Sequence, residues 1–153
     1  MQSWTEAQFE SMTWHDNHVH GFHIVAGEHG AGQLVLDLDY ILEWLPGPEN
    51  GFMFRIARAE LRFREVTSLR MTIDYAAASA AFGPFALHAI ERRIEARPRY
   101  EATIWTLALN WPVGEITFEA EGFAQRLLTE PIVTDRQWLT ENERATAQPN
   151  GVS

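Results

Sequence analysis

The sequence predicts a mainly β fold, an antiparallel sheet folded as a sandwich or partial barrel. Apolar and polar residues alternate over several segments, chain breakers recur at short spacing, and no long helical pattern separates the strands. The 153 residues, 46% of them hydrophobic, suffice for one core. We expect a single β-rich domain over 1–143 and a flexible tail over 144–153, where periodicity ends.

Helix-start signals occur near both termini. Thr5 is followed three residues later by Gln8, the spacing of a capping box. The same spacing returns at Thr134 and Gln137, after the break at Pro131. We therefore expect a short helix near each end of the chain, and an α+β arrangement stays open as the alternative.

Three segments in the first half of the chain alternate with a period of two. The clearest runs over 34–42, where the even positions are apolar and the odd positions include acids. Segments 57–63 and 69–75 alternate in the same way, with arginines on the polar side. Each segment is predicted to be a strand with one solvent-facing side.

The second half of the chain adds a predicted hairpin. Alternating segments 105–111 and 116–120 flank the turn residues 112–114, which include a proline and a glycine. Segment 85–96 fits both helical and strand spacing, and we favour a strand because the chain from Tyr100 onward can return as its hairpin partner.

Composition excludes several kinds of chemistry. The chain has no cysteine, which removes disulfides, thiolate nucleophiles and cysteine-ligated zinc. Its 12 basic residues are all arginine, which removes Schiff-base lysines and the P-loop lysine. No serine lies in a nucleophile elbow. Because neither an export signal nor a membrane-spanning apolar stretch is present, we expect a cytoplasmic protein without a membrane partner.

Acidic residues are concentrated in the first third of the chain. The net charge is −9, and residues 1–50 hold eight acids and no arginine, whereas the remainder holds 13 acids and 12 arginines. This charge opposes a phosphate backbone, so no nucleic-acid partner is expected. A basic protein partner is electrostatically favoured.

Four of the six histidines lie within residues 15–23. His18 and His20, two positions apart on a predicted strand, share a face, and His15 precedes the strand and is free to join them. Neutral imidazoles in this arrangement are ligands for zinc and other divalent metals. His15, His18 and His20 are therefore the candidate metal ligands, although no cofactor is required by the rest of the sequence.

Strand register tests that metal site. Matching apolar residues pairs Phe22 with Leu38 and gives a three-residue loop, 29–31, between the first two long strands. His23 then opposes Asp37 on the solvent side as a cross-strand pair, while His18 and His20 fall on the apolar side. The register thus predicts that the sheet divides the histidines.

The outward acids of the second strand form a further candidate site. Asp37, Asp39 and Glu43 lie at alternating positions and are predicted to face solvent. Such a row of carboxylates is usually a solvated strand face, and it is also a candidate binding surface for a basic partner.

Two short motifs give the sequence a family resemblance. The chain contains the turn Trp14-His15-Asp16 and the run 36–44, Leu-Asp-Leu-Asp-Tyr-Ile-Leu-Glu-Trp. With these motifs it resembles small uncharacterised bacterial β-rich proteins similar to the immunity protein 50 family of polymorphic toxin systems. The resemblance implies an intracellular protein that binds and blocks a toxin, and it brings no catalytic residues.

These observations lead to one main hypothesis and two alternatives. The main hypothesis is a small cytoplasmic interaction domain without catalytic activity, of the immunity type that binds and blocks a toxin. The first alternative is a metal-binding protein or metal-dependent enzyme built on the histidines of the first strand. The second is a binder of a small apolar ligand held among aromatic side chains in a barrel.

Overall fold

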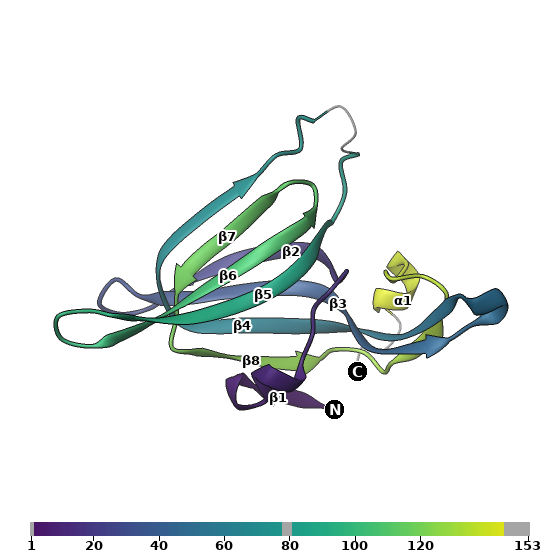
Figure 1. Cartoon of the computed structure of the whole chain (residues 1–153), viewed down its shortest axis with the longest axis horizontal. Helices are drawn as coiled ribbons and strands as arrows, with labels where there is room; N and C mark the ends of the chain where they lie inside the picture. The colour runs from purple at the N-terminus through teal and green to yellow at the C-terminus, as the bar shows by residue number, and fades with distance from the viewer. Residues whose placement is uncertain (1, 78–80, 146–153) are drawn as a thin grey trace.

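The computed structural model describes residues 2–77 and 81–145 and confirms a mainly β protein (Figure 1). Within these residues, nine strands form one antiparallel sheet, and the helices are all short. The strands are β1 Ser3–Thr5, β2 His18–Ala26, β3 Gly32–Pro46, β4 Phe52–Ile73, β5 Phe85–Ala96, β6 Glu101–Trp111, β7 Gly114–Glu119, β8 Gly122–Leu127 and β9 Ile132–Thr134. The helices are the 3-10 helices η1 Glu6–Ser11 and η2 Pro48–Asn50 and the α-helix α1 Glu141–Ala145.

Strand β4 links the two halves of the sheet. The sequence predicted separate strands over 57–63 and 69–75, but the structure has one strand of 22 residues with a bend. Glu65 and Ser68 adopt φ values of 56° at the bend, a conformation that turns an extended chain. Before the bend β4 pairs with β3 and β8, and after it β4 pairs with β7.

Six strands form a partial ring. The pairing runs β4, β3, β2, β5, β6 and β7, and the contact between β7 and the second half of β4 completes the ring. The contact between β2 and β5 is its shortest junction, because only His18 and Val19 pair with Ala86 and Phe85. The arrangement is the sheet folded on itself that the sequence predicted.

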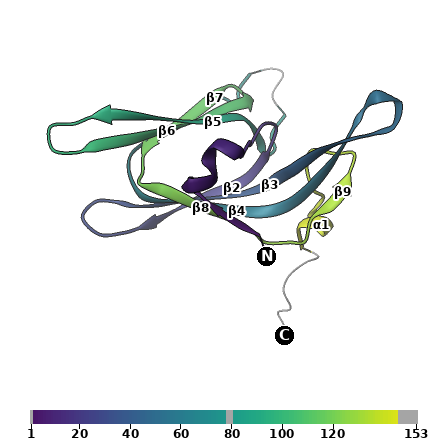
Figure 2. The same cartoon turned by 60° about the horizontal axis from the view of Figure 1, so that its bottom comes forward.

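Large apolar side chains fill the interior of the folded sheet. The even-numbered residues of β3 from Leu34 to Tyr40 point into this core, together with the most deeply buried aromatic side chains, Trp105, Phe63, Phe118 and Phe123. Helix η1 lies between the two layers of the sheet (Figure 2). Its Phe9 contacts Trp105 edge-to-face, with ring centroids 5.4 Å apart.

Several local predictions are confirmed. Thr5 and Gln8 form the expected capping box at the start of η1. Segment 85–96 is a strand, and it pairs with β6 as expected. The turn at 112–114 connects β6 to β7 as a hairpin.

The predicted register between β2 and β3 is wrong by two residues. Phe22 opposes Leu36 instead of Leu38, and the connecting loop spans five residues, 27–31. Gly32 explains part of this difference, since a Cβ there would lie 2.3 Å from the carbonyl oxygen of Val25, so the strands approach too closely for a side chain. A bulge between Val19 and Gly21 shifts the register again.

The second predicted helix start is also wrong. Thr134 lies in β9, and the C-terminal helix begins later, at Glu141. Thr140 and Glu143 supply its capping box, with each side chain accepting a hydrogen bond from the backbone N–H of the other. Of the predicted tail 144–153, the first two residues belong to α1, and the remainder lies outside the described residues. No helix in the described part is long and apolar enough to span a membrane.

Candidate functional site

Asp39 lies at the centre of a charged cluster on the outer face of β3. Its side chain is 0% exposed and accepts hydrogen bonds from His20 Nε2 at 2.7 Å and from the backbone N–H of Leu139 at 3.0 Å. The guanidinium group of Arg144 in α1 also donates to it. Because a buried carboxylate needs charged or polar partners, Asp39 holds the C-terminal segment against the sheet.

Asp37 completes this cluster with two arginines. Arg58 donates from Nε and Nη2 at 3.1 Å each, and Arg144 Nη2 lies 2.5 Å from the same carboxylate. Burial raises the pKa of Asp37, but the hydrogen bonds from both arginines outweigh burial and lower the pKa below its ordinary value. Asp37 is therefore ionised at neutral pH, and its charge is matched within the cluster.

The predicted acidic binding surface is not formed as expected. Asp39 is buried under the C-terminal segment, and Asp37 is bound by arginines, so only Glu43 of the three is exposed. The period-two pattern correctly placed Asp37 and Asp39 on one face, but a bulge between Ile41 and Glu43 puts Glu43 on the opposite face, where it opposes Arg55. The pattern carried no information about a distant segment, 132–145, that covers part of the face of the two aspartates.

The histidines of β2 lie on the same face as Asp37 and Asp39. His18 opposes Asp39 and His23 opposes Val35, and residues opposite each other in an antiparallel pair share a face. His20 reaches the same face because it bonds to Asp39. The predicted division of the histidines by the sheet is therefore wrong, and the bulge after Val19 is the physical reason.

The histidines nevertheless form no metal site. The ring of His15 lies against the carbonyl oxygen of His88, with Nδ1 at 3.2 Å, and Nδ1 of His18 lies 3.1 Å from the carbonyl oxygen of Asp16. His20 is engaged by Asp39. Across residues 2–77 and 81–145, no group of three or more His, Asp or Glu side chains is placed to hold a metal ion.

The predicted pair of His23 and Asp37 is also absent from the structure. Gly21 opposes Asp37, and the partners of that carboxylate are Arg58 and Arg144. The two-residue error in register accounts for this difference, since it displaced His23 along β3.

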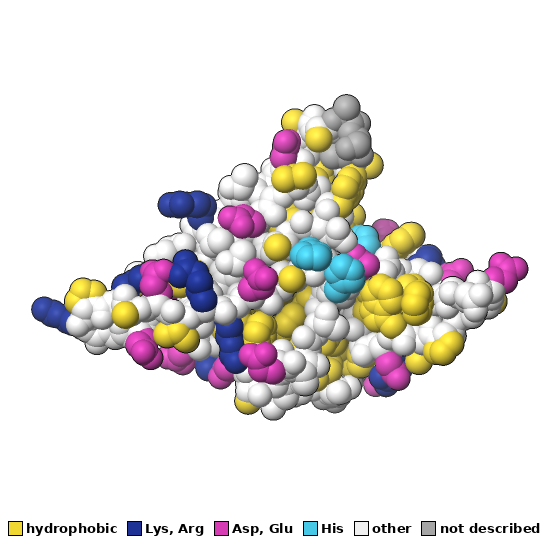
Figure 3. All heavy atoms as spheres, viewed as in Figure 1, with side chains coloured by type: hydrophobic (Ala, Val, Ile, Leu, Met, Phe, Trp, Pro, Cys, Tyr) yellow, Lys and Arg dark blue, Asp and Glu magenta, His cyan; other side chains and the backbone are white. Residues whose placement is uncertain are grey.

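Beside the charged cluster, the half-buried rings of two histidines gather with three exposed aromatic rings into a group that we call the aromatic surface: His15, His18, Trp44, Phe52 and Trp138. His15 stacks on Trp44 with centroids 6.2 Å apart, and His18 contacts Trp138 at 5.6 Å. Trp44 meets Phe52 edge-to-face at 5.4 Å. Figure 3 shows histidine side chains next to a hydrophobic patch near the β3–β4 hairpin. Clustered exposed aromatic rings are typical of recognition surfaces.

A groove of about 440 Å³ runs between Trp44 and Trp138. Its floor includes the buried Phe54, which belongs to a small second core with Ile41, Ile56 and Leu139. The groove is therefore built on packed residues of two strands and on the C-terminal segment that Asp39 anchors.

The charges around the groove are arranged asymmetrically. Arg136 lines it, but Glu143 binds this guanidinium through two hydrogen bonds of 2.9 Å. Asp135, also in the lining, is exposed. Burial lowers the pKa of His18, so this imidazole is neutral at neutral pH and adds no positive charge.

Asp16 connects the aromatic surface to the rest of the fold. It has φ 64°, which aspartate tolerates better than most residues, and its backbone N–H donates to Leu87 at 2.8 Å. Its carboxylate accepts from Asn110 and from Gln137, the latter at 3.0 Å. Asp16, next to His15 in the chain, thus links β5, β6 and the C-terminal segment through hydrogen bonds.

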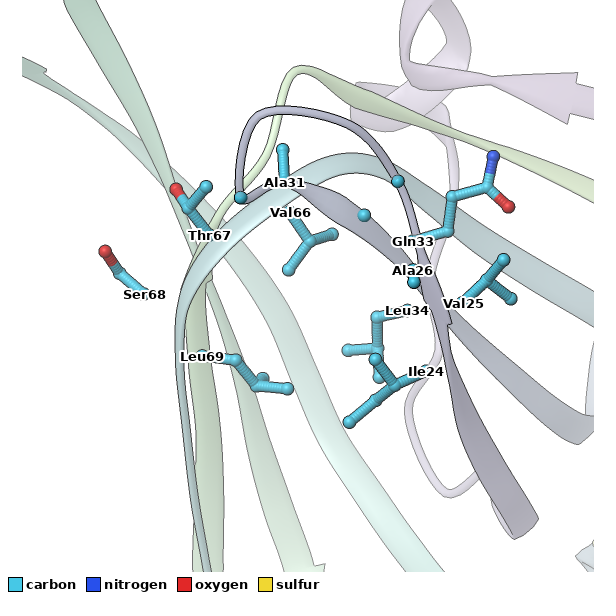
Figure 4. A pocket seen from close by; sticks show the side chains of 13 residues that line it. Ile24, Val25, Ala26, Ala31, Gln33, Leu34, Val66, Thr67, Ser68 and Leu69 are labelled. Carbon is cyan, nitrogen blue, oxygen red and sulfur yellow. The ribbon is translucent and has the colours of Figure 1, made fainter.

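A second cleft, with a mainly apolar lining, lies at the tip of the β2–β3 hairpin (Figure 4). Ile24 and Leu34 line it from the hairpin, Val66 and Leu69 line it from the bend of β4, and its volume is about 380 Å³. Inside the ring, the aromatic side chains of Phe63, Trp105 and Phe118 are each at most 1% exposed and belong to one core cluster.

Sequence reasoning did not identify Arg144 as a partner of the two aspartates. It also did not identify Trp138 as a residue that lines the groove with Trp44. The spacing Thr140-Glu141-Asn142-Glu143 is a capping-box signal that identifies the helix carrying Arg144. Nothing in the local pattern pairs Trp138 with Trp44, because the two lie on segments distant in sequence.

Comparison of the chain with protein-family models, curated proteins and solved structures gave no match. The candidate functional site therefore consists of the aromatic surface, its groove and the charged cluster that supports them, as defined by geometry alone.

Proposed function

We propose that the protein is a binding domain whose groove between Trp44 and Trp138 takes an arginine or lysine side chain of a basic protein partner. The observation that carries this proposal is the exposed cluster of Trp44, Phe52 and Trp138 around a groove. The face of an aromatic ring attracts a cation, and tryptophan does so most strongly.

The charge of the molecule supports a cationic partner. The chain carries −9 overall, which attracts a basic protein over a distance comparable to the Debye length. At the groove, Glu143 neutralises Arg136, so the nearest guanidinium repels an incoming cation less, while Asp135 attracts it.

The rigid support of the groove favours binding as well. Trp138 precedes Leu139, whose backbone N–H is bound by the buried carboxylate of Asp39. Trp44 packs on Phe54 with centroids 5.0 Å apart. Side chains that are already ordered lose less entropy when a partner binds.

The direct test uses a fluorescent peptide of alternating arginine and glycine, with a glutamate–glycine peptide as the charge control. We expect saturable binding of the arginine peptide alone, weakened by salt. Trp44→Ala and Trp138→Ala should each lower affinity by about two- to thirty-fold, because one ring contributes about 0.5–2 kcal/mol to cation binding.

Trp111→Ala is the matched control, since Trp111 is 38% exposed and Trp44 is 37% exposed. It removes an equally accessible tryptophan from outside the groove lining. Equal affinity of Trp44→Ala and Trp111→Ala, or binding of both peptides alike, would overturn the proposal.

The sequence resemblance supports a more specific form of this function, in which the basic partner is a toxin that the protein blocks. The test is toxin activity in cells that also express this chain, using a basic toxin encoded beside its gene. The wild type and Trp111→Ala should protect the cells, and a Trp44→Ala/Trp138→Ala double variant should not. Full protection by a folded double variant would reject the groove as the toxin-binding site.

A further inference from the structure

One edge of β2 has no strand partner over most of its length. β2 pairs with β3 from His18 to Ala26, but on its other side it pairs with β5 only through His18 and Val19. Beyond that junction the β2–β3 and β5–β6 hairpins diverge (Figure 2). Among the described residues, no strand pairs with this second edge of β2 over residues 20–26.

This edge lacks the features by which proteins prevent strand pairing. Residues 20–26 include no charged side chain other than histidine and no proline, and Phe22 and Ile24 are exposed. The facing edge of β5 instead contains four charged residues between 91 and 95, which hinder the approach of another strand. An uncharged, partly apolar edge of this length is a template for pairing with another chain.

The inner side chains of this edge also have uncovered apolar surface next to them. Phe22 opposes Leu36 and Ile24 opposes Leu34, so both lie on the core-facing side of the sheet, yet they remain exposed. Ile24 lines the open cleft with Val66 and Leu69. A strand added to β2 would place its own inward side chains beside these residues.

We propose that a second copy of the chain occupies this edge, with the two β2 strands pairing antiparallel about a twofold axis at His23. In this register Phe22 opposes Ile24 of the partner subunit. The same apolar pair recurs on the other side of the twofold axis. Residues 20–26 contain no acid, so the paired strands bring no carboxylates into contact. The remaining repulsion between two chains of net charge −9 is screened by salt, so salt should strengthen the dimer.

Sedimentation velocity over a range from low micromolar to submillimolar protein tests this proposal. A single short strand pair buries less area than a standard stable interface, so we expect a concentration-dependent shift from monomer to dimer. Ile24→Lys should abolish the shift. Ile94→Lys is the matched control, because Ile94 is 60% exposed and Ile24 is 65% exposed, and it should dimerise like the wild type. Unchanged circular dichroism and melting temperature confirm that both variants fold.

A monomer at every concentration, or equal dimerisation of the two lysine variants, would overturn the proposal. So would a ladder of higher oligomers, because a twofold contact closes after two copies.

Cross-linking tests the register separately. Since the chain has no cysteine, His23→Cys introduces the sole thiol, and the twofold axis brings it next to its counterpart. A short bismaleimide should convert His23→Cys to covalent dimer and leave Ile94→Cys monomeric. Equal yields from the two variants would contradict pairing at β2.

Discussion

The two ends of the β2–β3 hairpin differ in what packs on them, and we call them the covered end and the bare end. At one end the outer face is covered by the C-terminal segment, which Asp39 and Arg144 hold in place. At the other end Phe22 and Ile24 remain exposed beside an open cleft. Both ends belong to strands of similar apolar and polar alternation, so the difference arises from what covers the strand and not from the strand itself.

The comparison also separates two kinds of recognition surface. The covered end presents rings from distant segments on a packed base, which suits a specific side chain of a partner. The bare end presents main-chain groups and aliphatic side chains, which suit another strand. One hairpin therefore supports two proposals that can fail independently.

Removal of the buried carboxylate should have the largest effect. Asp39→Ala leaves the N–H of Leu139 without its acceptor and leaves Arg144 paired with Asp37 alone, and breaking a buried ion pair costs about 3–5 kcal/mol. Urea unfolding measures this loss. Glu43→Ala, at an exposed position of the same strand, should change the free energy of unfolding by less than about 0.5 kcal/mol. Similar losses for the two variants would show that Asp39 is not a structural anchor.

The same substitution at the two ends provides the next comparison. Ile41→Ala, in the small core under the groove, should cost about 2–4 kcal/mol through lost burial and a cavity. Ile24→Ala, at the bare end, should cost less than about 0.5 kcal/mol in the monomer. If the two variants lose the same free energy of unfolding in dilute solution, Ile24 is packed in solution as Ile41 is, and the two ends of the hairpin do not differ.

The pH dependence of stability gives a smaller effect at the helix that covers the core. A side-chain hydrogen bond from Arg64 lowers the pKa of Glu6 to about 2 from an ordinary value of 4.5. A lowered folded-state pKa stabilises the protein above the unfolded value, so this contribution is complete above pH 4.5 and is lost as pH falls toward 2. The stability difference between wild type and Glu6→Gln should therefore shrink over this range. A difference that stays constant would mean that the pair contributes no pH-dependent stability.

Local signals in the sequence predicted much of the fold. Alternation identified β3, the capping box identified η1 at Thr5, and the turn at 112–114 identified the β6–β7 hairpin. In each case the information lies within a few neighbouring residues. Sandwich and barrel could not be separated because the bend at 65–68 in β4, which folds the sheet on itself, resembled a break between two strands.

The candidate site was predicted less well because it depends on distant contacts. A one-residue bulge after Val19 brought His18, His20 and His23 to one face, and alternation alone does not reveal a bulge. Asp39 looked solvent-exposed because the residue that pairs with it, Arg144, is 105 positions away. The residue types of the site were therefore visible, whereas their partners were not.

The indole N–H region of a nitrogen–proton correlation spectrum tests the proposed function most directly. Each of the six tryptophans contributes one indole signal. On titration with the arginine–glycine peptide, we predict that the signals of Trp44 and Trp138 shift together and saturate, while those of Trp105 and Trp111 stay in place. Shifts confined to Trp111, or no saturable shift at either groove tryptophan, would contradict a groove that binds a basic partner.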